Sequence, residues 1–207
     1  MSELVAATVS CPSRELHRDK PATQNAVSRL PSGIYNRCVS NVRRLLVTDR
    51  IFFVTVNLQR GIPYFSEGEF PLLIQALQVC RERTPFLLCG YVLMPDHWHA
   101  LICTQYPVTV SRTIQDVKWL SARLINRHRG SKGSIWQRQF WDRFVRHKKE
   151  FCERLDYMHL NPVNKSLAAR PEQWRWSSYN NFALEKSVVE SCHLKIDHVD
   201  LSDQYRG

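Results

Sequence analysis

Two apolar runs of strand length, separated by a two-residue turn, constrain the fold of this chain most strongly. FLLCGYVLM occupies residues 86–94 and HWHALIC occupies residues 97–103. Pro95 and Asp96 between them are turn-forming residues, and a proline is rarely found inside a central strand. Short apolar runs bounded by such signals are typical of buried strands. The sequence therefore predicts a β-hairpin that is buried on at least one face.

Further strands and helices are expected on both sides of this hairpin. Residues 51–58 are rich in β-branched and aromatic side chains, which predicts a strand. The spacing of apolar residues predicts one helix that ends near residue 83, opened by a capping box of Ser66 and Glu69, and a second helix that ends near residue 128.

The remaining pattern indicates a short extended segment within residues 135–146 and a helix over residues 148–160, which Pro162 is expected to end. The resulting order is strand, helix, strand, strand, helix, strand, helix. It predicts an α+β fold with an antiparallel sheet and helices packed mainly on one face.

The length of 207 residues suits one domain with extensions. Residues 1–46 mix Ser, Pro, Asn and Arg without periodicity and are expected to form a mobile basic arm. The structured domain is expected over residues 47–183, followed by a polar C-terminal tail over residues 184–207.

Positive charge is concentrated in the second half of the chain. Lys and Arg outnumber Asp and Glu by 29 to 19 overall, and residues 112–149 hold eleven basic but only two acidic residues. Aromatic residues are interspersed among these charges, and such side chains can stack on unpaired bases. Nucleic acid is the expected partner, and the alternative is a solvated helix face.

Seven cysteines without any C-x-x-C spacing fit neither a disulfide framework nor a zinc knuckle. A reducing cytoplasm is the expected location. The first residues lack the pattern of a secretory signal, and no apolar run is long enough to cross a bilayer, so no membrane association is expected.

His97 and His99 form the first motif that suggests chemistry. Side chains alternate along a strand, so these two imidazoles should share one face, about 7 Å apart at Cα from two rises of roughly 3.3 Å, while Trp98 points into the core. Two such imidazoles can bind one metal ion. An isolated H-x-H pair also occurs by chance.

Tyr157 and Asn161 form the second motif. Residues four apart share one face of a helix, so the phenol and the carboxamide should project together. The alternative is a core tyrosine followed by an asparagine that ends the helix before Pro162.

These motifs together resemble a known family. YVLMPDHWHALI (91–102), WQRQFWDRFVR (136–146), YMHLNPV (157–163) and WRWSSY (174–179) are similar to the HUH single-tyrosine transposases, and most similar to the REP-associated branch. The resemblance covers roughly residues 50–182. This chain has Asp96 where Asn commonly precedes the first histidine, a change expected to matter little, and Lys165-Ser166 where Ala-Gly is frequent.

The resemblance implies a ferredoxin-like domain with the two histidines on a central strand and the tyrosine on a late helix. It implies that His97, His99 and Asn161 bind Mg²⁺ or Mn²⁺, and that Tyr157 is the nucleophile, forming a 5′-phosphotyrosine link to single-stranded, hairpin-forming DNA. The implied assembly is a monomer or a homodimer. The residues expected to contact DNA are basic: Lys118, Arg123, Arg138, Arg143, Arg146 and Arg154.

Two other functions remain open from the sequence. A catalytically silent DNA- or RNA-binding module would use the basic residues alone. A metal-dependent hydrolase would use the H-x-H pair with water as the nucleophile. No general base is evident in the sequence, and neither the target DNA sequence nor the role of the terminal segments can be read from it.

Overall fold

A four-stranded antiparallel sheet forms the centre of the molecule. The computed structural model describes residues 50–182, 186–190 and 192–199, so the expected N-terminal arm lies outside the described residues. The elements in chain order are β1 (Arg50–Asn57), α1 (Phe70–Arg83), β2 (Phe86–Leu93), β3 (His97–Thr104), α2 (Val110–Arg129), β4 (Trp141–Phe144), α3 (Lys148–Asn164), the short 3₁₀ helices Pro171–Gln173 and Tyr179–Phe182, and α4 (Lys186–Glu190).

The strands lie in the order β2-β3-β1-β4, and every neighbouring pair is antiparallel. β2 and β3 form the hairpin that the two apolar runs predicted, and the turn between them is closed by a hydrogen bond from the Met94 amide to the His97 carbonyl. The expected α+β architecture is confirmed.

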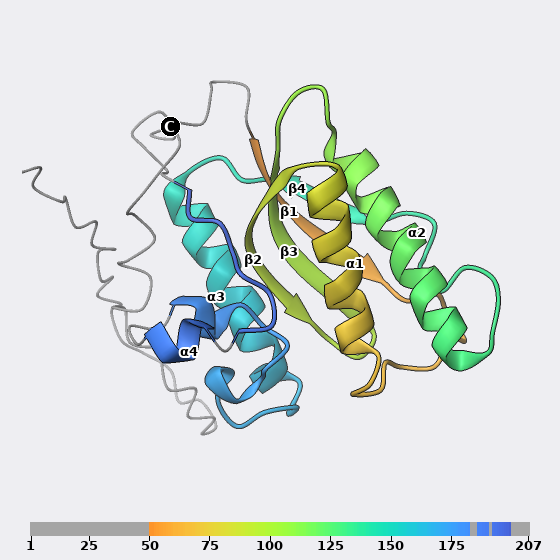
Figure 1. Cartoon of the computed structure of the whole chain (residues 1–207). Helices are drawn as coiled ribbons and strands as arrows, with labels where there is room; N and C mark the ends of the chain where they lie inside the picture. The colour runs from red at the N-terminus through yellow and green to blue at the C-terminus, as the bar shows by residue number, and fades with distance from the viewer. Residues whose placement is uncertain (1–49, 183–185, 191, 200–207) are drawn as a thin grey trace, which may run out of the picture.

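Helices cover both faces of the sheet (Figure 1). α1 and α2 pack together on one face, where Trp98 and Val54 are fully buried. α3 packs on the opposite face against a second core cluster that includes Leu101 and Phe53. Two of the three long helices therefore share a face, as expected, and α3 adds a third layer.

The close approach of α3 to the sheet depends on Gly90 of β2. A Cβ atom at this position would lie 2.7 Å from Cδ2 of Leu155 and 3.0 Å from Cε of Met158, which is closer than nonbonded carbons normally come. Both of these α3 side chains are fully buried. The absent side chain of Gly90 thus sets how near α3 lies to the strands.

The expected end of α3 at Pro162 is wrong, because the helix continues to Asn164 with Pro162 inside it. Proline removes one backbone donor from the helix. The last turn persists because Met158, Asn161 and Pro162 are buried against the rest of the domain, and the amide of Lys165 still donates to the Asn161 carbonyl at 3.0 Å. Tertiary packing here outweighs the local preference. Among the described helices, none is long and apolar enough to span a bilayer.

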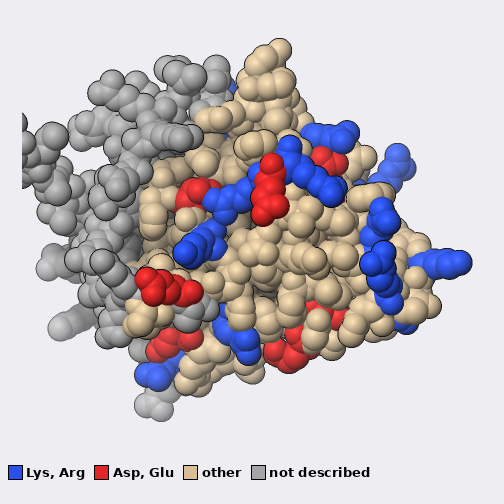
Figure 2. Space-filling view, viewed as in Figure 1, with Lys and Arg blue, Asp and Glu red and all other residues tan. Residues whose placement is uncertain are grey.

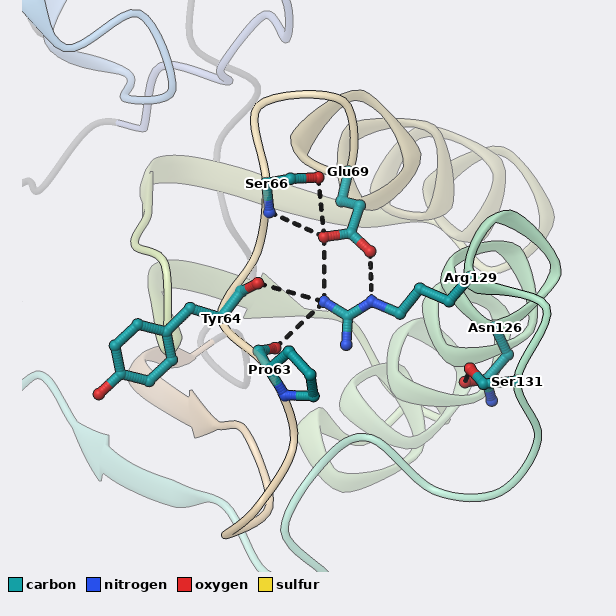
Figure 3. Close-up of polar contacts among 7 residues, drawn as sticks. All are labelled: Pro63, Tyr64, Ser66, Glu69, Asn126, Arg129 and Ser131. Atoms are coloured by element: carbon teal, nitrogen blue, oxygen red, sulfur yellow. Dashed lines mark hydrogen bonds and ion pairs between the residues drawn. The ribbon is translucent and has the colours of Figure 1, made fainter.

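A buried ion pair joins the segment before α1 to the end of α2 (Figure 3). The Ser66 amide and hydroxyl both donate to the Glu69 carboxylate, at 2.7 and 3.0 Å. The expected capping box does not open the helix, because α1 begins at Phe70 with Glu69 as its N-cap and without a side-chain cap. Arg129 donates to both carboxylate oxygens of Glu69 and to the carbonyls of Pro63 and Tyr64. Glu69 is almost fully buried, so this arginine supplies its counter-charge.

Residues 192–199, which belong to the segment expected as a polar tail, pack along β2. The Asp197 amide donates to the Leu88 carbonyl, and the Asp197 carboxylate accepts from the Leu88 amide, both at 2.8 Å. Arg81 of α1 also binds this carboxylate. Leu194 and Val199 are buried, so this segment contributes to both core clusters.

Replacing Gly90 by Ala is expected to lower the free energy of unfolding by about 1–3 kcal/mol, since the added methyl group overpacks the contact between β2 and α3. Thermal or chemical unfolding measures this loss. Gly68→Ala is the matched control, because the nearest atom to its Cβ is 3.9 Å away. Adding Leu155→Val to Gly90→Ala should recover part of the loss, and equal stability of the two Gly variants would contradict the proposed steric cause.

Replacing Arg129 by Met leaves the Glu69 carboxylate buried without its cation and is expected to cost about 3 kcal/mol at pH 7. Arg112→Met is the control, because its ion pair with Asp116 is exposed and should contribute less than about 1 kcal/mol. Urea unfolding of both variants checks this difference.

The same variant should alter the pH dependence of stability. Burial alone raises the pKa of Glu69, but hydrogen bonds from Arg129 and Ser66 outweigh it and hold the pKa below its ordinary value of 4.5. The ionised carboxylate therefore stabilises the native protein above pH 4.5, and this contribution is lost as the pH falls through the lowered pKa. Arg129→Met lacks this stabilisation at any pH. The difference in free energy of unfolding between the native protein and the variant should therefore become smaller in acid, and a difference that stays constant would argue against the ion pair.

Candidate active site

His97 and His99 lie on the face of β3 that α3 covers. Their ring centroids are 4.7 Å apart, and the intervening Trp98 is fully buried on the opposite face. The alternation expected for a strand is therefore present. Hydrogen bonds hold the preceding turn in place, from the Leu58 amide to the Asp96 carbonyl and from the Phe65 amide to the Pro95 carbonyl, both at 2.8 Å.

Hydrogen bonds fix the tautomers of both imidazoles. The Asn161 Nδ2 lies 3.0 Å from His99 Nε2, which accepts, so neutral His99 carries its proton on Nδ1 and donates to Thr55 Oγ1 at 2.8 Å. His97 Nδ1 lies 2.6 Å from the Asp96 carboxylate, which can only accept when ionised. Neutral His97 then also has an unprotonated Nε2, the form in which imidazole binds a metal.

His99 remains neutral across the physiological pH range. Burial, and to a smaller extent the neighbouring His97, lowers the pKa of His99 to about 3. Its ring stacks on Phe53 at a centroid distance of 5.2 Å. This strand neighbour and Thr55 therefore hold the ring from two sides.

α3 brings Tyr157 and Asn161 to the same site from one helix face. The Tyr157 ring lies 5.4 Å from the His99 ring and 6.0 Å from the Phe53 ring, while 49% of the residue remains exposed. Asn161 is buried one turn later. A half-exposed phenol beside the His99 imidazole does not match a core tyrosine, which was the alternative from the sequence.

Asn161 is the third residue that the sequence analysis expected to bind a metal. Among the described residues, no cluster of three or more His, Cys, Asp or Glu could hold one. The carboxamide of Asn161 now donates through its nitrogen, and a half-turn of the group would direct its oxygen to the same place. Two imidazoles and one amide oxygen fit a divalent ion and leave other coordination positions open.

Two of the predicted DNA-contacting arginines lie near this site and share a buried carboxylate. Arg143 donates to Glu150 at 2.7 Å, and Arg154 approaches the same oxygen at 3.9 Å while its guanidinium lies 5.4 Å from the Phe53 ring centroid. Burial raises the pKa of Glu150, but hydrogen bonds from the Arg146 amide and from Arg143 outweigh it, so the net pKa is lowered. Glu150 thus orients two positive charges beside Phe53.

The other predicted DNA contacts are not at the site. Arg138 and Arg146 are exposed at the two ends of β4. Lys118 and Arg123 lie on α2, across the sheet from Tyr157. Lys118 donates to the carbonyls of Gln137 and Arg138 at 2.7 and 2.9 Å, and burial lowers its pKa.

Sequence reasoning missed Thr55, Phe53 and Glu150, because nothing in their local pattern distinguishes them from ordinary strand and helix residues. Their contacts with the site depend on the register of β1 against β3 and on the position of α3. Asp96 was expected to matter little, yet its carboxylate bonds to His97. The signal available in the sequence was an acidic residue directly before the first histidine.

Comparisons with known proteins match the expected family. Residues 69–147 match the family described as transposase IS200-like. A REP-associated tyrosine transposase of Escherichia coli K12 is 22% identical over 142 residues, covering 69% of this chain and 84% of that protein. A provisionally named REP-associated tyrosine transposase of Haemophilus influenzae is 27% identical over 155 residues, covering 69% of this chain and 86% of that protein.

A solved structure shares the fold. It is a REP-associated tyrosine transposase bound to a REP hairpin, with a TM-score of 0.57 and 23% identity, and the match covers 79% of this chain and 96% of that one. The matched family region contains the H-x-H pair, and the shared fold includes the sheet that carries it. Residues 69–147 thus resemble the IS200-like transposases, and the chain is similar to REP-associated tyrosine transposases over most of its length.

Proposed function

We propose that this protein is an enzyme that cleaves and rejoins single-stranded, hairpin-forming DNA through a covalent link to Tyr157. The observation that carries the proposal is the position of the half-exposed Tyr157 phenol beside the ring of His99, whose Nε2 faces Asn161. The family match and the REP hairpin in the related structure support DNA as the substrate.

In the proposed reaction, the Tyr157 oxygen attacks the scissile phosphorus and the bond to the 3′ oxygen breaks. The phenol loses its proton to solvent, which its exposure allows, and the departing 3′ oxygen takes one up. The phosphotyrosine link keeps the energy of the broken bond, so a second 3′-OH can reverse the step and join two strands without ATP.

His97, His99 and Asn161 would hold a divalent metal, and we propose Mg²⁺ or Mn²⁺. The bound ion would polarise a non-bridging oxygen of the scissile phosphate. Thr55 and Asp96 support the proposal because each accepts from an Nδ1–H and so leaves Nε2 of its histidine unprotonated. Such outer partners fix the tautomer and the orientation of metal-binding imidazoles.

Charge around Tyr157 would hold the DNA backbone in line with the phenol. Arg143 and Arg154 face the site from β4 and α3, and Glu150 restricts their positions. Arg138 and Arg146 extend the positive charge along the same strand. Ionic contacts of this kind release counterions, so the affinity should fall steeply as salt is raised.

A second basic region lies on α2 and would contact the hairpin away from the reaction. Figure 2 shows Lys and Arg side chains along the edge of the molecule formed by α2 and the loop after it. A cleft of about 500 Å³ there is lined by Lys118, Arg123, Arg127 and Lys132. Arg123 also lies 4.7 Å from the ring centre of Trp119, which is 56% exposed. A chromosomal substrate would place the protein at the nucleoid, as a monomer or a homodimer.

Denaturing electrophoresis of a labelled hairpin oligonucleotide incubated with protein and Mn²⁺ tests the nucleophile. The native protein is expected to retain label covalently, and Tyr157→Phe should lose this adduct because it lacks the attacking oxygen. Tyr179→Phe, which changes a buried tyrosine at the end of the domain, is the control and should keep the adduct. Cleavage without an adduct would indicate a water nucleophile, and binding without cleavage would indicate a silent DNA-binding module.

A titration with Mn²⁺ tests the metal site independently of cleavage, and the electron paramagnetic resonance signal of the free ion measures how much metal is bound. His99→Ala should abolish binding, and Thr55→Val should weaken it by about 10- to 100-fold, because the partner of His99 Nδ1 is lost. His128→Ala removes an exposed histidine of α2 and should leave the affinity unchanged. Equal affinity in all three variants would show that the ion binds elsewhere.

A further inference from the structure

The edge strand β4 presents an exposed tryptophan on the same face as the proposed active site. Trp98, Trp136 and Trp176 are buried in the core, whereas Trp141 is 68% exposed. No aromatic or cationic side chain among the described residues stacks on it. The exposed ring therefore presents an aromatic face on which a planar group can stack.

The strand register places Trp141 in one row with the site. Trp141 pairs with Thr55 of β1, and Thr55 pairs with His99 of β3. Residues directly opposite each other in antiparallel strands share a face, so all three side chains lie on the face covered by α3. Thr55 bonds to His99 within this row. Two strand spacings of about 4.8 Å separate the backbones of Trp141 and His99 by about 10 Å.

The neighbouring row supplies a cation on the same face. Arg143 pairs with Phe53, which contacts both His99 and Tyr157. Arg143 follows Trp141 by two strand positions, about 7 Å along the edge, and half of its side chain is exposed. The edge strand thus offers an aromatic face and a positive charge side by side, which suits a base and its phosphate.

We propose that Trp141 stacks on an unpaired base of the substrate close to the scissile phosphate, and that Arg143 binds the adjoining phosphate. A tryptophan face can stack on any base that is not already stacked in a duplex, so the site would select single-stranded DNA without reading its sequence. Arg138, Arg143 and Arg146 lie within five residues of Trp141 in the sequence, and this positive charge favours a polyanion over an apolar protein surface. The inference rests on the proposed function, because it takes DNA as the substrate.

Fluorescence anisotropy with a labelled hairpin that has a single-stranded flank tests this inference. All measurements use the Tyr157→Phe background, which keeps the ring but prevents the covalent link. Trp141→Ala is expected to weaken binding by about tenfold, within the range measured for loss of one base–aromatic stack. Trp141→Phe should keep most of the affinity. Unchanged thermal stability of both variants excludes a folding defect, as the exposure of this residue leads us to expect.

Abasic substitution along the flank locates the base. Each abasic site removes one base but keeps its phosphate. With Trp141 present, the loss of affinity should concentrate at one position beside the cleavage point, and with Trp141→Ala that position should become equivalent to its neighbours. Trp119→Ala is the matched control. This exposed tryptophan lies in the second basic region on α2, so its loss can lower the overall affinity but should leave the position-specific loss in place.

The possible failures are distinguishable. A flat abasic profile with Trp141 present, or equal affinity of Trp141→Ala and its parent, overturns the stacking role while the proposed function stands. Dissociation of an oligomer by Trp141→Ala, seen by light scattering, would assign Trp141 to an interface between two copies and also overturns it. Absence of any binding to the hairpin by the Tyr157→Phe protein would remove the proposed function and this inference together.

Discussion

The packing of α3 against the second face of the sheet is the contact on which the site depends. Tyr157 and Asn161 belong to this helix, while the two histidines belong to β3, so only the distance between helix and sheet brings them together. Gly90 sets that distance because Leu155 and Met158 occupy the space that a side chain would fill. Buried side chains of α3 hold the helix there, including Phe151 and Leu155.

The C-terminal part of the domain holds α3 from the other side. Ser178 Oγ donates to the Tyr91 carbonyl at 3.1 Å and lies 2.8 Å from His159 Nε2, which therefore donates to it. His159 is fully buried between the rings of Tyr179 and Phe182, and burial lowers its pKa to about 3. A neutral histidine thus links α3 to β2 through one hydroxyl. This link is a second attachment for the helix that carries the half-exposed tyrosine.

The two faces of the sheet have different tasks. The face covered by α1 and α2 holds the larger core cluster, and its outer surface carries the basic residues of α2. The face covered by α3 is closed by apolar packing at one end of the strands, and it carries His97, Thr55 and the half-exposed Tyr157. Successive side chains of β3 point to opposite faces, so Trp98 lies in the core while His97 and His99 lie at the site.

Local periodicity made much of this arrangement predictable from the sequence. The hairpin, the shared face of His97 and His99, and the shared face of Tyr157 and Asn161 follow from repeats of two and 3.6 residues, which depend only on neighbours along the chain. The positions of Thr55 and Trp141 follow from strand register, and the contacts of Glu150 and the helical conformation at Pro162 follow from packing of distant segments. These features join residues far apart in the sequence, so tertiary structure alone decided them.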